Sequence, residues 1–296
     1  MQRIAFLVLA LAPSVVAGQH AAGTQLWRLV AGTLPTPPAL GLGGTAGWWT
    51  PAQADVASVI SLEVVQTPAT AGASGFVAAT RLRVGARHRV GIAYGRMAIT
   101  DLVRTTLSPD PDGAGISYYT HTARALWAGD LAGATFGAAL AYHQTRLDDA
   151  LADRWTLDVG ARRDFGGRLV LAAATHFLNR LRADPAQDVY GAVQVRVWRG
   201  ELWPGSGQAA VHARYGIAFG HELAADHQIG TGLEVGNAFT ADLMLVREGG
   251  YVVSSWRPIA GIQLRVGRYR VLFSGDAGPR RVGAAYRVGL EARFRR

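Results

Sequence analysis

Apolar and polar residues alternate along most of the chain after about residue 56. The last segment is the clearest case: Tyr286, Val288 and Leu290 share one parity, whereas Arg287 and Glu291 take the other. Successive side chains of a β-strand point to opposite faces, so one face of this segment is apolar and the other is charged. The same two-residue period recurs throughout, and no long stretch follows the 3.6-residue period of a helix. The pattern predicts an all-β protein.

The alternation divides into about fourteen strands. The predicted strands cover residues 56–65, 75–86, 89–100, 116–128, 131–145, 154–163, 168–178, 188–198, 208–219, 228–236, 239–247, 258–266, 269–275 and 282–294. Strands of about ten residues have the length that a tilted membrane-spanning strand needs.

Short connections alternate with longer ones. Tight turns are predicted at residues 85–88, 129–130, 165–167, 236–237 and 267–268, each after an even-numbered strand. Longer connections, such as 67–74, 101–115 and 180–187, follow odd-numbered strands, and 199–207 is a long exception. Only residues 147–153 have a helix-like composition. Short turns on one rim and longer loops on the other are typical of an outer-membrane barrel, and an even strand count places both barrel ends on the periplasmic rim.

The residue types on the two parities favour lipid over water outside the sheet. The polar parity holds mostly Arg, Gly and Ala, where an exposed strand of a soluble protein favours Thr, Lys and Glu. Aromatic residues gather near strand ends, as in the girdles of membrane barrels; they are Tyr118, Trp127, Tyr142, Trp155, Trp198, Trp203, Tyr251, Trp256 and Phe294. We therefore expect a closed antiparallel transmembrane β-barrel surrounded by outer-membrane lipid. The alternative is a soluble periplasmic β-protein.

The first 55 residues divide into an export signal and a segment that does not alternate. Residues 1–17 contain Arg3, an apolar run and small residues before Gly18, which predicts a secretory signal peptide. The predicted location is the outer membrane of a Gram-negative bacterium. Residues 18–55 contain Pro35 and Pro37 and many glycines, which predicts a plug-like or periplasmic segment before a barrel at residues 56–296.

This N-terminal segment carries a family resemblance. A glycine-rich stretch with Gly41, Gly43 and Gly44 is followed by Pro51 in a Pro-Ala sequence just before the first strand. These features resemble the PorV/PorQ and FadL-like group of outer-membrane barrels. The resemblance implies a monomer whose N-terminal segment lies inside or under the lumen. It also implies uptake of hydrophobic solutes or, for the PorV and PorQ branch, secretion-system partners. The alternation that ends at Phe294 resembles the signal read by the barrel assembly machinery.

Charge and composition exclude several other classes of protein. The formal net charge is +9 with 30 basic residues, all of them Arg, and these are spread along the chain rather than clustered as in nucleic-acid-binding proteins. There is no Cys, which excludes disulfides and zinc–thiolate sites. Four histidines are candidates for a catalytic site: His121 near Ser117, His227 beside Asp226, and the separate His143 and His176. None of them belongs to a set of nucleophile, base and orienting acid. We therefore expect that the protein is not an enzyme and that it binds no cofactor or metal.

The charged face of the predicted strands is the most informative surface. The residues predicted to line the lumen are Arg81, Arg83, Arg162, Arg196, Arg214, Arg265, Arg287 and Glu291. They have two interpretations: ladders of arginine and carboxylate that stiffen the wall, or a cationic lumen that favours anions and fatty-acid carboxylates. The predicted function is non-enzymatic transport of a small-molecule solute, or a secretion-associated role. The alternatives are a general diffusion porin constricted by loop 101–115 and, less favoured, a barrel lipid hydrolase or protease.

Overall fold

A computed structural model describes residues 22–41, 45–52, 58–66, 72–100, 102, 115–179, 188–205, 207–220, 225–247, 249, 256–276 and 284–294. The predicted signal peptide, Gly43, Gly44, Tyr251 and most of loop 101–115 lie outside these residues. None of the described helices has the length and apolar character needed to cross a membrane.

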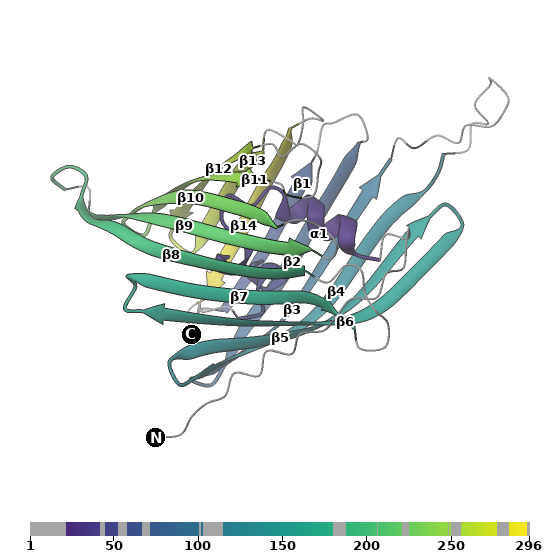
Figure 1. Ribbon diagram of the computed structural model, residues 1–296, viewed down its shortest axis with the longest axis horizontal. Coiled ribbons are helices and arrows are strands. Elements are labelled where there is room, and N and C mark those ends of the chain that lie inside the picture. Colours follow the sequence, from purple (N-terminus) through teal and green to yellow (C-terminus); the bar gives the residue numbers. More distant parts are fainter. Residues whose placement is uncertain are drawn as a thin grey trace.

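The chain forms a closed antiparallel barrel of fourteen strands in sequence order, with β1 paired to β14 (Figure 1). The strands are β1 (Ser58–Gln66), β2 (Ala73–Val84), β3 (His88–Ile99), β4 (Tyr118–Leu131), β5 (Ala134–Leu147), β6 (Ala150–Phe165), β7 (Leu169–Leu178), β8 (Asp188–Glu201), β9 (Gln208–Gly220), β10 (Asp226–Val235), β11 (Phe239–Arg247), β12 (Trp256–Val266), β13 (Tyr269–Asp276) and β14 (Ala285–Phe294). The predicted fold class is confirmed, and each predicted strand overlaps an observed one.

The barrel turns its apolar side chains outward and many of its charged side chains inward. In β14, Val288 is 52% exposed and Leu290 is 53% exposed, whereas Arg287 is 1% exposed and Glu291 is 4% exposed. A protein surrounded by water buries these residue types the other way round. The exposed apolar surface is the arrangement that a lipid environment requires of a barrel wall.

The described residues 22–41 and 45–52, here called the plug, lie inside the barrel. They form α1 (Thr24–Ala31), the 3₁₀ helix η1 (Pro38–Leu40) and α2 (Ala46–Trp49). Figure 1 shows the purple ribbon of α1 enclosed by the strands. Leu26 and Val30 of α1 are fully buried. The helices were not predicted, because segments this short do not complete enough turns to show a helical period.

Three predicted connections were placed wrongly. Residues 129–130 belong to β4, and the turn falls at residues 132–133, where Ala132 and Gly133 both have positive φ. Residues 147–153 are not helical: β5 and β6 meet in a tight turn at Asp148, whose φ is 54°. The long exception at 199–207 is shorter than predicted, because its first three residues continue β8. The pairing of β8 with β9 shifts register between Arg196 and Trp198. This shift interrupts the two-residue alternation, so the sequence alone predicts that the strand ends at residue 198.

Candidate functional site

Two glycines of the barrel wall make room for prolines of the plug. A Cβ atom at Gly261 of β12 would lie 2.6 Å from Pro35 Cγ, and one at Gly216 of β9 would lie 2.7 Å from Pro37 Cβ. Real Cβ atoms do not approach other heavy atoms so closely. At both of these positions the plug rests directly on the backbone of the wall, where only glycine leaves enough space.

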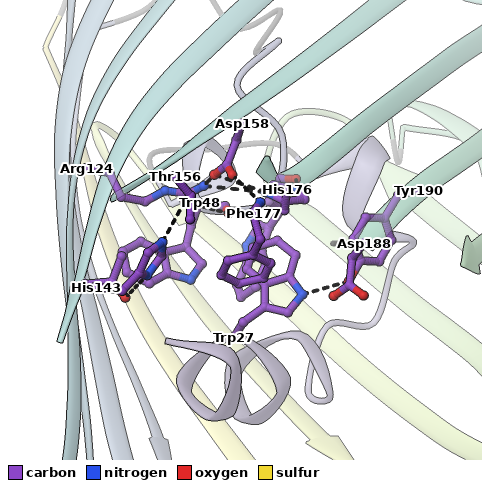
Figure 2. A network of polar contacts seen from close by, with 12 residues as sticks. Trp27, Trp48, Arg124, His143, Thr156, Asp158, His176, Phe177, Asp188 and Tyr190 are labelled. Carbon is purple, nitrogen blue, oxygen red and sulfur yellow. Dashed lines mark hydrogen bonds and ion pairs between the residues drawn. The ribbon is translucent and has the colours of Figure 1, made fainter. Parts of the chain in front are cut away.

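A buried charged cluster holds the backbone of α2. Arg124 of β4 donates a hydrogen bond of 2.5 Å to the carbonyl of Trp48, and its guanidinium lies 5.2 Å from the centre of the Trp48 ring. His176 of β7 lies 2.7 Å from the carbonyl of Trp49 through its Nε2. Asp158 of β6 forms an ion pair with Arg124 and lies 3.2 Å from His176 Nδ1, as Figure 2 shows. Two strands thus bind two adjacent carbonyls of the plug, and Asp158 of a third strand contacts both of the side chains that do so.

A β-bulge supplies this cluster with its geometry. The pairing of β6 with β7 shifts register between Leu157 and Val159, and Phe177 on the opposite strand has a φ of 60°. The Phe177 N–H donates a hydrogen bond of 2.9 Å to Asp158 Oδ1. Consecutive strand residues normally face opposite sides, but His176 and Phe177 are both buried. The bulge therefore directs two neighbouring side chains toward the plug.

Helix α1 is attached to the opposite side of the cluster through Trp27. Its indole N–H donates a hydrogen bond of 2.7 Å to the hydroxyl of Tyr190 in β8. The Trp27 ring lies 4.2 Å from the ring of His176 and 5.0 Å from that of Trp49, measured between centroids. Figure 2 shows Trp27 on the side of His176 that lies away from the Asp158 carboxylate. The aromatic group and the charged cluster together attach α1 and α2 of the plug to the barrel wall.

A cavity of about 340 Å³, here called the vestibule, lies between the plug and the wall formed by β8–β14. Its plug side includes the apolar residues Leu34, Leu40 and Trp49. Its barrel side carries the charged residues Arg214, Glu234, Asp242, Arg265, Arg270, Arg287, Glu291 and Arg293. Five arginines face three carboxylates, so the lining is net positive. The vestibule reaches residues 236–237 of the β10–β11 turn, on the rim of short connections.

The sequence matches no family model and no curated protein. The solved structure of the toluene transporter TodX of Pseudomonas putida superposes with a TM-score of 0.57 at 11% identity, covering 86% of this chain and 95% of that one. The toluene transporter TbuX of Ralstonia pickettii gives 0.56 at 12% identity, covering 89% of this chain and 98% of that one. The chain therefore shares the fold of these two transporters. The PorV and PorQ branch stays a prediction.

Within the barrel, the predicted lumen residues lie in different places. Arg214, Arg265, Arg287 and Glu291 come together in the vestibule. Arg162 and Arg81 are buried elsewhere, and the Arg162 guanidinium donates to the carbonyl of Leu40 at 3.3 Å. Arg196 is half-buried, and Arg83 is exposed at the end of β2, where it binds the carbonyls of Gly85 and Ala86 in the adjoining turn. Of the N-terminal motif, Gly41 lines the vestibule and Pro51 is buried against Gly137.

Both interpretations of the charged parity have support in the vestibule. Arg214 pairs with Asp242, and Glu291 pairs with Arg270 at 2.5 Å and with Arg293 at 2.6 Å. The pairs Arg214–Asp242 and Arg270–Glu291 join different strands, as in the ladders that stiffen a wall, whereas Glu291–Arg293 lies within β14. The excess of arginine over carboxylate nevertheless leaves the cavity with a positive field, which attracts anions.

The residues weighed for catalysis lie in structural hydrogen bonds. His143 contacts the hydroxyls of Thr122 and Thr156, each at 2.8 Å. His121 contacts Gln144, and His227 contacts the Tyr215 hydroxyl at 2.7 Å. Among the described residues, no group of three or more His, Asp or Glu could hold a metal ion.

The residues that anchor the plug are not among those predicted from the sequence. Trp27, Trp48 and Arg124 were not singled out, because their partners lie on strands far away in the chain. The only local signal was the Trp48-Trp49 pair, two large aromatics in a segment without strand alternation.

Proposed function

We propose that this chain is a non-enzymatic outer-membrane barrel that admits small organic solutes past its plug. The observation that carries the proposal is the vestibule, which joins an apolar plug surface to an arginine-rich wall inside a closed barrel. Its volume of about 340 Å³ is in the range of small-molecule sites. A solute with an apolar body and one anionic group matches both sides of this cavity.

Three independent features support a location in the outer membrane. The barrel exposes apolar side chains on its outer surface, residues 1–17 have the features of an export signal, and the fold matches two transporters named for toluene. A wall of this kind is stable in lipid because every strand pairs on both edges.

A general diffusion porin is the alternative that the interior disfavours. A porin needs an open lumen, whereas Trp27, Trp48 and Trp49 of the plug are buried inside this barrel. Passage through a plugged barrel requires the plug to shift, which makes transport selective and slow compared with free diffusion.

The direct test is flux through purified protein in liposomes. We expect labelled benzoate to enter faster than in protein-free vesicles, and faster than benzylammonium, which has similar size and opposite charge. Arg265→Gln removes a vestibule charge and should reduce the benzoate flux, because Arg265 contributes to the positive lining.

Arg163→Gln is the matched control, because Arg163 is exposed on the outer face and lies against Phe165 outside the vestibule. Equal fluxes with and without the folded protein would contradict the proposed transport. Equal fluxes of benzoate and benzylammonium would leave transport standing but remove the anion preference.

A further inference from the structure

A polar row crosses the outer face of the barrel over four neighbouring strands. Arg96 of β3 pairs in register with His121 of β4, His121 with Gln144 of β5, and Gln144 with Asp153 of β6. His121 Nε2 lies 2.6 Å from Gln144 Oε1, so the two central residues of the row are joined by a hydrogen bond. Polar side chains on the lipid-facing side of a barrel are costly away from the membrane surface. The row therefore marks where the outer face meets lipid headgroups.

Tyrosines link this row to an apolar surface one step further along the strands. The Tyr94 hydroxyl lies 3.5 Å from His121 Nδ1, and the Tyr142 hydroxyl donates a hydrogen bond of 3.3 Å to Asp153. The rings of Tyr142 and Trp155 pack with their centroids 5.1 Å apart. The aromatic rings point their polar atoms to the row and their carbon surface away from it, as at a membrane interface.

Beyond these rings, the outer face is hollowed into an apolar groove of about 800 Å³. Its floor is made of small residues from β2 and β4, namely Ala78, Thr80, Ala123 and Ala125. Larger residues form its sides, namely Ile60, Ile92, Tyr94, Leu140, Tyr142 and Trp155. The register places Ala125 between Ile92 and Leu140, which explains the depression: a methyl group lies between two longer side chains.

Positive charge lies at the β3 end of the polar row, in Arg96, and one step beyond the row, in Arg146. Tyr119 lies two residues before His121 in β4, nearer the end of the barrel where β3 ends and β4 begins. It pairs in register with Arg146 of β5. The guanidinium of Arg96 lies 5.4 Å from the centre of the Tyr119 ring. Arg96 and Arg146 are both exposed, whereas Asp153 lies at the far end of the row from Arg96. Arginine is suited to phosphate, because its planar donors match the phosphate oxygens.

We infer that this face binds one phosphorylated lipid of the surrounding leaflet. An acyl chain lies in the alanine-floored groove, the ester region contacts the polar row, and the phosphate is held by Arg96 and Arg146. Along the barrel axis the apolar groove is followed by the polar row, with Arg96 at one end, and then by Arg146, which is the order of acyl chain, ester region and phosphate in a membrane lipid. The inference rests on the proposed membrane location, because only lipid chains have access to a groove on a membrane-embedded wall.

The test compares two lipids that differ only in the phosphate. The full chain, purified in detergent, is mixed with dioleoyl phosphatidic acid or with dioleoylglycerol, and native mass spectrometry counts the lipid molecules retained. We expect one retained phosphatidic acid, held at least about tenfold better than dioleoylglycerol. The double variant Arg96→Gln with Arg146→Gln should abolish that preference, and Ala123→Phe, which fills the groove, should lower retention of both lipids.

Matched controls change the same residue types elsewhere on the outer face. Arg163→Gln and Ala260→Phe alter exposed residues on β6 and β12 and should leave retention unchanged. Heat-modifiable migration on a gel reports separately whether each variant is a folded barrel.

A folded barrel that retains both lipids equally, or whose retention falls as much in the controls, would overturn the inference. If Ala123→Phe does not fold, the arginine double variant still tests the inference, because loss of the preference for phosphatidic acid supports it and an unchanged preference contradicts it. Failure of the wild-type chain to insert into liposomes would contradict the proposed function instead.

Discussion

The fit between Gly261 and Pro35 predicts that a single methyl group will loosen the plug. A Cβ atom at Gly261 would lie 2.6 Å from Pro35 Cγ, 2.8 Å from Pro35 Cβ and 3.3 Å from Ser274 Cβ. The proline ring is rigid, so Gly261→Ala can be accommodated only if the plug moves away by about 1 Å. Overpacking of this kind costs about 1–3 kcal/mol.

This overpacking energy destabilises only the state in which the plug occupies its observed position, here called seated. If the displaced plug is free of the clash, the ratio of displaced to seated plug rises by about 5-fold to 150-fold, since 1.4 kcal/mol corresponds to a factor of ten. Gly191→Ala is the matched control, because its Cβ would meet only Ile217 at an ordinary 3.6 Å.

Single-channel recording in a planar bilayer measures the displaced state as the fraction of time the barrel conducts. A variant that lacks residues 22–52 sets the conductance of an unplugged barrel. We expect rare openings in the wild type, more frequent openings of the same size in Gly261→Ala, and no change in Gly191→Ala. The reasoning is wrong if Gly261→Ala, shown to be folded, opens no more often than Gly191→Ala while the unplugged variant conducts. A silent unplugged variant would show that the plug is not what closes the lumen.

Three further predictions follow from the plug anchors and the export signal. Asp158→Asn leaves the buried Arg124 without its carboxylate and should destabilise the seated plug by about 3–5 kcal/mol, seen as frequent openings and easier unfolding in urea; unchanged recordings would contradict the anchoring role. Trp27→Phe removes the hydrogen bond to Tyr190, worth about 1 kcal/mol, and should raise the open fraction about fivefold, an effect that should vanish in a Tyr190→Phe background. The intact mass of protein isolated from outer membranes should correspond to a chain that begins at Gly18; a mass that includes residues 1–17 would exclude cleavage there.

The strands could be predicted because their signal is local. Tyr286, Val288 and Leu290 alternate with Arg287 and Glu291 within six residues, and the two-residue period of a strand converts that order directly into two faces. The apolar parity on the outside and the arginines on the inside follow from the same rule once the sheet closes in lipid.

Turn positions were less well determined. Gly129 resembles a turn residue in the sequence, yet it lies within β4 and pairs with Phe136 of β5. The hairpin turns three residues later. The register of the two strands decides where a hairpin turns, and that register depends on side chains from both strands together.

The anchors of the plug were decided by the tertiary structure alone. Arg124, Asp158 and His176 come from three strands, and they meet only because the order and register of the strands bring inward-facing residues of β4, β6 and β7 to one part of the wall. The bulge in the pairing of β6 with β7 then turns Phe177 inward beside His176. The vestibule arises in the same way, since Arg214 and Arg287 are 73 residues apart and share a wall only after the sheet closes. The chain therefore encodes the two faces of each strand in neighbouring residues. The contents of the interior depend on register, bulges and barrel closure, which are properties of all fourteen strands at once.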